Sequence, residues 1–210
     1  MLLDYEDARR LAKKYGMPLV AGRCFTTLDE AKDIARKLKP PFVVKVLGPG
    51  VMHKTEKRLI ALNLDSLDEI SVAMDKLSRN ARGMEVDCFL MQEQRQGVEL
   101  IIGGKRDPAF GAIVLFGSGG IMAELYGDVA MRAAPLSRKD ALEMLAETKA
   151  NAFFSEKGFR GRKACEDCVV KLLIGTSRLM LGEPQVKELD FNPVIADTRE
   201  AAIVDARIIV

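Results

Sequence analysis

The first part of the chain alternates between helical and extended patterns of hydrophobic residues. Apolar residues recur at helical spacing after Thr27 and after Ser66, and each of these is followed three residues later by a glutamate. This arrangement is a capping box, which satisfies the free amides at the start of a helix. A further helix is predicted over residues 4–16, and apolar strands are predicted over residues 42–46 and 59–64.

The second part of the chain has a different pattern. Apolar stretches separated by turn residues predict successive antiparallel strands, at residues 86–93, 97–107 and 111–117. Helices are predicted from Ser137 to about Ala150 and over about residues 164–181. Three more strands are predicted near the end, at residues 186–191, 194–197 and 202–209. The pattern predicts an α+β fold in two parts, residues 1–91 and 92–210.

Composition and charge narrow the class of protein. The 210 residues are 48% hydrophobic and 30% charged, which is typical of a globular protein with its own core. The 32 basic residues are spread along the chain and nearly balanced by 30 acidic ones, so no nucleic-acid partner is expected. Neither an amino-terminal apolar segment nor a span long enough for a bilayer is visible. We therefore expect a cytoplasmic protein without a membrane partner.

The cysteines do not predict a disulfide framework, because no secretory signal accompanies them. Cys165 and Cys168, in "CEDC", have the spacing of a zinc or redox pair, but a zinc site needs two further ligands. The only histidine, His53, has no partner of that kind nearby in the sequence. The preferred interpretation is that both cysteines are small residues on a helix, with a metal or redox role as the alternative.

A row of oxygen-bearing side chains is the clearest chemical signal. In "ELDFNP", Glu188, Asp190 and Asn192 stand on alternate positions of a predicted strand that stops at Pro193. Alternate side chains share one face, so the three would form a row while their apolar neighbours enter the core. Carboxylate and amide oxygens are the ligands that Mg²⁺ prefers. The alternative is a solvated acidic face on an edge strand.

Other signals are weaker when each is taken alone. Lys45 lies inside the apolar stretch "FVVKV", where its ammonium must meet an anion or reach water at a strand edge. "FGSGG" is a glycine loop directly after a strand, and backbone amides in such loops can hold phosphate. Gln92 and Glu93 end a strand near the predicted break, either lining a nucleotide pocket or lying at the surface.

Taken in order, these segments resemble one family. A lysine strand is followed by "HKT", "MQE", "VELIIGGKRDPAFG", "FGSGG", "RAAPLS", "FRG", "ELDFNP" and "VDARI". The combination spans essentially the whole chain and closely resembles the ATP-grasp β subunit of acyl-CoA synthetase (ADP-forming), also called acetate–CoA ligase (ADP-forming). The resemblance implies an ATP-grasp fold with two lobes gripping a nucleotide.

The resemblance also implies an enzyme that interconverts acyl-CoA, phosphate and ADP with carboxylate, CoA and ATP. In this family CoA and the main phosphorylated histidine belong to a separate α subunit or domain. The phosphohistidine carries the phosphoryl group to the nucleotide held by the grasp part. The implied cofactors are Mg²⁺ and ATP or ADP, and the implied partner is a CoA-binding α subunit in a hetero-oligomer.

The family's site residues carry over by motif, as implications of the resemblance. They are Lys45 at the nucleotide phosphates, Gln92 and Glu93 on the adenine side, Glu99 near the ribose or the metal network, Gly117, Gly119 and Gly120 at the travelling phosphoryl group, and Asp190 and Asn192 as Mg²⁺ ligands supported by Glu188.

His53 aligns with the histidine of the family's "HK[ST]" motif, a candidate second phosphoryl carrier. Imidazole suits that role because it is nucleophilic and neutral near pH 7, although a lone histidine is also common at surfaces. The chain departs from the family directly afterwards, in "EKRLIAL", where Lys57, Arg58 and Leu59 stand at positions that the family fills with small residues, usually paired glycines. Its bulky residues would obstruct the approach of phosphate, or Arg58 would supply positive charge to it.

Two alternative functions remain open. One is a non-catalytic, grasp-like regulatory or scaffold subunit, which "EKRLIAL" favours and the intact "ELDFNP" disfavours. The other is a different ATP-grasp ligase that activates a carboxylate as an acyl phosphate.

Overall fold

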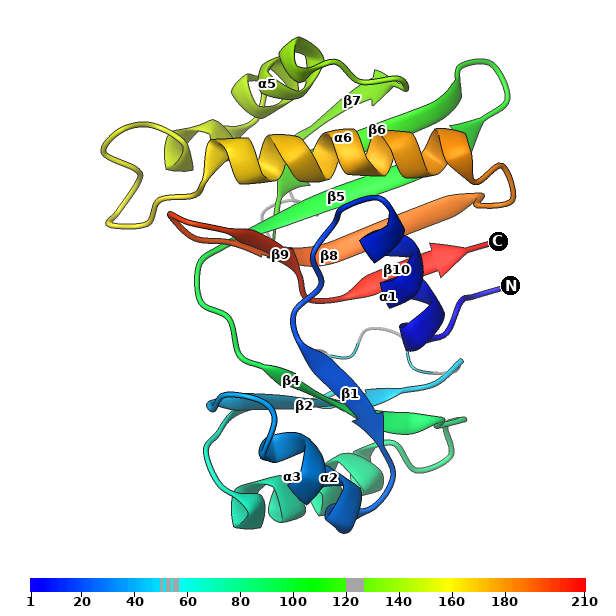
Figure 1. Ribbon diagram of the computed structural model, residues 1–210, viewed down its shortest axis with the longest axis vertical. Coiled ribbons are helices and arrows are strands. Elements are labelled where there is room, and N and C mark those ends of the chain that lie inside the picture. Colours follow the sequence, from blue (N-terminus) through cyan, green and yellow to red (C-terminus); the bar gives the residue numbers. More distant parts are fainter. Residues whose placement is uncertain (50, 52–53, 55–56, 120–126) are drawn as a thin grey trace. The chain divides into compact units, whose positions relative to one another are not determined.

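The structure, a computed structural model, describes residues 1–49, 51, 54, 57–119 and 127–210. The chain divides into two compact units, the larger made of Met1–Leu19 with Gln96–Val210 and the smaller made of Val20–Arg95 (Figure 1). This division differs from the predicted one in two respects. The chain passes between the units four residues later than the predicted break after residue 91, and its first nineteen residues belong with the carboxy-terminal part.

The smaller unit is an antiparallel sheet with helices on one face (Figure 1). Its strand order is β1-β4-β2-β3, with β1 at Gly22–Phe25, β2 at Phe42–Leu47, β3 at Ile60–Leu64 and β4 at Cys88–Glu93. The helices α2 (Leu28–Ala35) and α3 (Leu67–Asn80) begin at the predicted capping boxes. The side chain of Thr27 accepts a hydrogen bond from the Glu30 amide at 3.3 Å, and Ser66 accepts one from Glu69 at 3.2 Å.

The larger unit is built on a second antiparallel sheet, with α6 (Glu166–Gly182) lying across β5 and β6 (Figure 1). The strand order is β10-β8-β5-β6-β7, with β9 also paired to β8. The strands are β5 at Val98–Asp107, β6 at Gly111–Ser118, β7 at Val129–Ala133, β8 at Glu188–Ala196, β9 at Ala201–Ile203 and β10 at Ala206–Ile209. The antiparallel pairing predicted for the stretches now seen as β5 and β6 is confirmed.

The amino terminus belongs to the larger unit because it pairs and packs there. The amide of Leu3 donates to the carbonyl of Ile208 in β10 at 2.9 Å. Helix α1 (Tyr5–Lys14), capped by Asp4 as predicted, lies beside β10 and buries Ala8 and Ala12 in the core of this unit (Figure 1). Sequence periodicity identified this helix but contained no signal for its partner.

Several predicted elements change their limits. The predicted helix from Ser137 to Ala150 is a helix, α5 (Arg138–Ala146), followed by a 3₁₀ turn, η1 (Lys149–Phe153). The predicted stop at Pro193 is wrong, because β8 continues through this residue. Proline lacks an amide hydrogen, and Pro193 lies where the β5–β8 register shifts, between the Leu100 and Ile102 pairs, so no ladder bond is lost.

Other differences concern short segments. The predicted strand over residues 202–209 is divided into β9 and β10 by a break at Val204 and Asp205. The strands β1 and β7 were not predicted, since both are short and partly exposed and lack a continuous apolar pattern. None of the described helices is long and apolar enough to cross a bilayer.

The cysteine pair also differs from its preferred interpretation. Cys165 is the N-cap of α6 and Cys168 lies in its first turn, and the two form a disulfide. Treating them as two plain helix residues is therefore wrong. Cys24 and Cys88 remain thiols.

Candidate functional site

Lys45 and Gln92 lie on one face of the smaller unit's sheet. The strands β2 and β4 are central, and Phe42, Val44 and Met91 on them pack into the core beneath the helices. Because side chains alternate along a strand, Lys45 and Gln92 point to the opposite face. Lys45 pairs with the residue two positions before Gln92, so the two are diagonal neighbours, with Cβ atoms on the order of 7 Å apart.

Both side chains are buried. Lys45 is 2% exposed and Gln92 is 1% exposed, so the alternative that places Lys45 at a solvated strand edge is wrong. Neither Oε1 nor Nε2 of Gln92 has a hydrogen-bond partner among the described residues. A buried amide without partners costs about 1–3 kcal/mol. The edge of a purine presents both a donor and an acceptor, so the Gln92 amide fits a base.

Glu93 and Glu99 have different surroundings. Glu93 follows Gln92 and therefore points to the other face, where its carboxylate accepts from the Lys39 amide at 3.1 Å and lies 3.7 Å from the Arg95 guanidinium. Glu99, in the larger unit, has an exposed side chain on β5. Its carbonyl accepts from the Gly119 amide at 2.9 Å.

The predicted oxygen row is present on β8 of the larger unit. Glu188 and Asn192 are exposed and Asp190 is half-buried, while Leu189 and Phe191 between them are buried in the core. This alternation confirms the predicted geometry of the row. The alternative of an edge strand is wrong, because β8 is paired on both sides, by β10 and by β5.

Asp205, which was not among the predicted site residues, lies next to this row in the structure. Its backbone carbonyl accepts from the Asn192 amide at 3.1 Å. Burial, and then the negative charge of Asp205, raises the pKa of Asp190, while the Arg207 guanidinium opposes this shift. The signal in the sequence is "VDARI", a motif of the family pattern that contains Asp205, although no site role was predicted for that residue.

This donor set fits a magnesium ion. Asp190, Asp205 and Asn192 offer two carboxylates and an amide oxygen, and a cation would relieve the repulsion that raises the pKa of Asp190. Within the described ranges, no three His, Cys, Asp or Glu side chains are grouped so as to hold a metal by themselves. That is compatible with Mg²⁺, which usually keeps waters and phosphate oxygens among its ligands.

Gly117 and Gly119 have structural reasons to be glycine. A Cβ on Gly117 would lie 2.9 Å from the Asp128 carbonyl oxygen, and one on Gly119 would lie 2.5 Å from the Glu99 carbonyl carbon. Both positions therefore require glycine for close backbone packing, independently of their predicted contact with the phosphoryl group. Gly120 and His53, which the sequence also singled out, lie outside the described residues.

Arg58 occupies a strained backbone position. Its φ is 54°, in the left-handed region that favours glycine, and a non-glycine residue there costs about 1–2 kcal/mol. The side chain is exposed, and the backbone carbonyl accepts from Asn80 Nδ2 at 2.9 Å. The position therefore retains a glycine-like conformation although the residue is arginine.

Comparison with known proteins extends these observations. Residues 1–210 match the model of the ATP-grasp domain family. The chain is 33% identical over 217 residues to the β subunit of ADP-forming acetate–CoA ligase II from Pyrococcus furiosus, covering 99% of this chain and 91% of that one.

Solved structures agree with the sequence comparison. The chain matches a dinucleotide-forming acetyl-coenzyme A synthetase 1 from Ca. Korarchaeum cryptofilum in complex with coenzyme A and Ca-AMPCP. The TM-score is 0.93 at 36% identity, covering 100% of this chain and 93% of that one. A second complex of that protein holds coenzyme A and Mg-AMPPCP, with its phosphohistidine segment pointing towards the nucleotide binding site. Its TM-score is 0.85 at 36% identity, covering 100% of this chain and 92% of that one.

Proposed function

The chain belongs to the ATP-grasp domain family, and on this basis we propose that it binds the nucleotide in an ADP-forming acyl-CoA synthetase. It is β-subunit-like over its full length and has the ATP-grasp fold. The proposed reaction interconverts acyl-CoA, phosphate and ADP with carboxylate, CoA and ATP. The observation that carries the proposal is the extent of the similarity, which spans 99% of this chain and 91% of a named β subunit.

In the smaller unit, the proposed nucleotide contacts are made by Lys45 and Gln92. A buried ammonium next to a buried amide suits a ligand that carries both anionic phosphates and a hydrogen-bonding base. Lys45 would neutralise phosphate charge during transfer, which is how most catalysis of phosphoryl transfer is achieved. Glu93, which points to the other face, is proposed to act only through the backbone at the adenine side.

In the larger unit, the proposed Mg²⁺ ligands are Asp190, Asn192 and Asp205, with Glu188 as support. A bound Mg²⁺ would neutralise charge on the phosphates. The protein's own contribution is to hold two carboxylates and an amide on a rigid sheet. Glu99 stays a predicted contact of the ribose or the metal network, and Gly117, Gly119 and Gly120 stay predicted contacts of the phosphoryl group.

The proposal includes a partner that binds CoA. Relatives named as β subunits imply other subunits, and the phosphohistidine segment in one relative points towards its nucleotide site. We therefore propose a hetero-oligomer in which the partner supplies CoA binding and a phosphorylated histidine. His53 is proposed as a second phosphoryl carrier, and a cytoplasmic location stays a prediction.

Calorimetric titration of the purified chain with ADP and ATP, with and without Mg²⁺, tests the proposal. We expect micromolar binding, about −8 kcal/mol, that depends on Mg²⁺ and weakens at least tenfold in Asp205→Ala and Lys45→Met. Asp33→Ala, which changes an exposed ion pair on α2, is the matched control and should bind like the wild type. Absence of binding by a folded wild-type chain, both alone and with a CoA-binding partner, would contradict the proposal.

The same titrations, together with an assay of ATP formation, separate the alternatives. A scaffold subunit would fold but bind neither nucleotide. A different ATP-grasp ligase would bind Mg-ATP but form no ATP from acyl-CoA, phosphate and ADP when the CoA-binding partner is added.

A further inference from the structure

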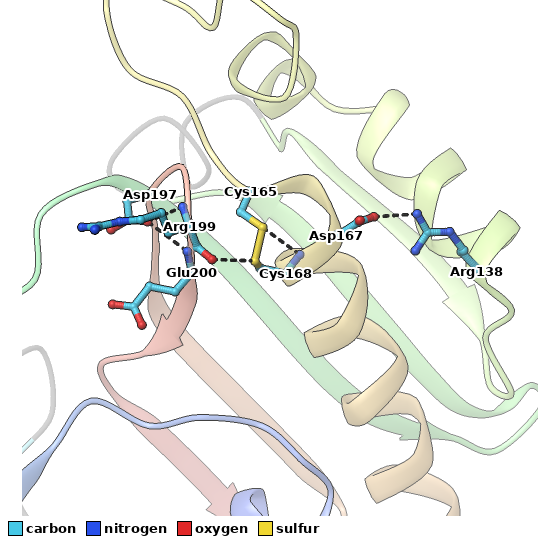
Figure 2. The surroundings of a disulfide bond; sticks show 7 residues. All are labelled: Arg138, Cys165, Asp167, Cys168, Asp197, Arg199 and Glu200. Atoms are coloured by element: carbon cyan, nitrogen blue, oxygen red, sulfur yellow. Dashed lines mark hydrogen bonds and ion pairs between the residues drawn. A yellow bond between two sulfur atoms is a disulfide. The ribbon is translucent and has the colours of Figure 1, made fainter.

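We propose that Cys165 and Cys168 form a thiol–disulfide exchange site at the start of α6, which reacts with external thiols and disulfides. Their disulfide closes the first turn of the helix (Figure 2). Both cysteine residues are half-buried and neither is fully enclosed. The proposal concerns a part of the larger unit that the nucleotide chemistry does not use, and it goes beyond the proposed function.

The position of Cys165 favours a reactive thiolate after reduction. Its Sγ is the N-cap acceptor of α6 and receives the Cys168 amide hydrogen at 3.3 Å. Free amides and the positive end of a helix dipole stabilise the negative charge of a thiolate. Glu166 and Asp167 oppose this effect, but the Asp167 carboxylate is paired with the Arg138 guanidinium at 2.5 Å (Figure 2).

The exchange is a balanced two-electron reaction. A thiolate of an external dithiol attacks Cys165 Sγ, forming a mixed disulfide while Cys168 leaves as a thiolate and takes a proton. The second thiol of the reagent then displaces Cys165, so the reagent is oxidised to a disulfide and the protein is reduced to two thiols. In the reverse direction the Cys165 thiolate attacks an external disulfide, and Cys168 resolves the intermediate.

The disulfide is held against the turn that joins β8 to β9. The Cys165 amide donates to the Asp197 carbonyl at 2.6 Å. Cys168 Sγ lies 3.3 Å from the Arg199 carbonyl oxygen (Figure 2). Asp197 organises the turn by accepting from the amides of Arg199 at 2.7 Å and Glu200 at 2.9 Å.

Reduction therefore adds a hydrogen-bond donor at a defined place. A disulfide sulfur has no hydrogen, whereas the Cys168 thiol can donate to the Arg199 carbonyl oxygen that already faces it. The redox state should consequently change the stability of the turn formed by residues 197–200. That turn directly follows β8, the strand that carries Asp190 and Asn192.

Redox titration of the full chain tests the exchange. The protein is equilibrated with dithiothreitol or with mixtures of reduced and oxidised glutathione, alkylated, and analysed by peptide mass spectrometry. We expect Cys165 and Cys168 to become labelled together in one two-electron transition, whereas labelling of Cys24 and Cys88 does not follow that transition. Labelling of both cysteines in oxidised glutathione alone, or no reduction of the folded protein by dithiothreitol, would overturn the proposal.

Single variants test the assigned roles. Cys168→Ser should accumulate a mixed disulfide between Cys165 and glutathione when treated with oxidised glutathione. Cys165→Ser should react at least tenfold more slowly, and Cys24→Ser should behave like the wild type. Equal rates in the two CEDC variants would refute the role of Cys165 as the attacking thiol.

Hydrogen exchange tests the link to the turn. We expect the amides of Arg199 and Glu200 to be more strongly protected in the reduced wild type than in the oxidised form. The double variant Cys165→Ser/Cys168→Ser should show the same protection in both buffers. Identical protection of these amides in the two forms of the wild type would overturn the link.

Discussion

Asp190 lies on β8 and Asp205 lies in the break between β9 and β10, yet they are close enough for the charge of Asp205 to act on Asp190. Burial is the main cause of the raised pKa of Asp190, and the charge of Asp205 is the next. The amide of Asn192, two residues along β8, is bonded to the Asp205 carbonyl at 3.1 Å, so the backbone holds the three residues together. Without a cation, the ionised carboxylate of Asp190 therefore destabilises the folded state.

Asp190→Asn should stabilise the protein at neutral pH in the absence of divalent cations. The folded-state pKa of Asp190 is raised above its ordinary value of 3.8, so the folded state holds this proton more tightly than the unfolded state. Wild-type stability should therefore fall, relative to the variant, as pH rises from about 3.8 through the folded-state pKa. Thermal unfolding at a series of pH values measures this difference.

Magnesium should reverse the order of stability of the wild type and Asp190→Asn. A cation that binds only the folded state stabilises it, so Mg²⁺ should raise the melting temperature of the wild type more than that of Asp190→Asn. Asp33→Asn, at an exposed pair, serves as the control for charge removal. An equal response of wild type and Asp190→Asn to Mg²⁺ would count against the metal site.

Gln92→Met should stabilise the unliganded protein and weaken nucleotide binding. The side-chain amide of Gln92 is buried, and neither of its polar atoms is hydrogen-bonded among the described residues. Methionine has a similar shape but no polar group whose burial destabilises the protein. We expect a gain of about 1 kcal/mol in unfolding free energy, measured by denaturant titration, and at least tenfold weaker binding of Mg-ADP. A destabilised variant with unchanged affinity would mean that Gln92 is a packing residue.

The elements of this fold were largely predictable, because capping boxes and hydrophobic periodicity are local signals. Asp4, Thr27 and Ser66 begin helices as expected. The row on β8 was predictable for the same reason, since alternation along a strand is fixed by backbone geometry.

What the sequence could not predict depends on long-range contacts. Placing α1 with the larger unit requires the pairing of Leu3 with Ile208. Adding Asp205 to the row requires knowing that the segment before β10 returns to β8. The burial of Gln92 likewise follows from tertiary structure. The disulfide between Cys165 and Cys168 is local, but the spacing of two cysteines does not by itself distinguish a disulfide from two thiols.

Gly119→Ala separates a packing role from a phosphate-binding role. Its Cβ would lie within 2.9 Å of three Glu99 atoms, so we expect a loss of about 1–3 kcal/mol of stability. Gly103→Ala is the control for stability alone, because the nearest atom to its Cβ would be at 3.5 Å, an ordinary contact, whereas Gly103 pairs with Asp190 of the proposed metal site. If Gly119→Ala unfolds like the wild type but fails to bind nucleotide, the glycine is needed for the ligand and the packing argument is wrong.

His53→Ala should abolish phosphoryl transfer while leaving nucleotide binding intact. The expectation rests on the "HKT" motif and on the nucleophilicity of neutral imidazole. ATP formation is measured with the CoA-binding partner present, and calorimetry with Mg-ADP is the control for binding. Wild-type turnover by this variant would remove His53 from the mechanism.

Glu183 should make the protein less stable as the pH falls below about 4.5. Hydrogen bonds from Lys14 at 2.6 Å, from Gln185 at 2.7 Å and from Tyr15 at 2.8 Å lower the pKa of its carboxyl to about 2. A lowered folded-state pKa means that the stabilisation is complete above the unfolded value of 4.5 and is lost as pH falls towards 2.

Glu183→Gln should therefore destabilise the protein by roughly 1–2 kcal/mol at pH 7, a figure reduced because Lys14 is largely exposed to solvent. The difference from the wild type should shrink between pH 4.5 and pH 2, as protonation of the wild-type carboxyl removes the same interactions. Urea titrations across this range measure it, with Asp33→Asn as an exposed-pair control that changes stability little at any pH. A difference that stays constant from pH 7 to pH 3 would show that the charge of Glu183 does not join α1 to the end of α6.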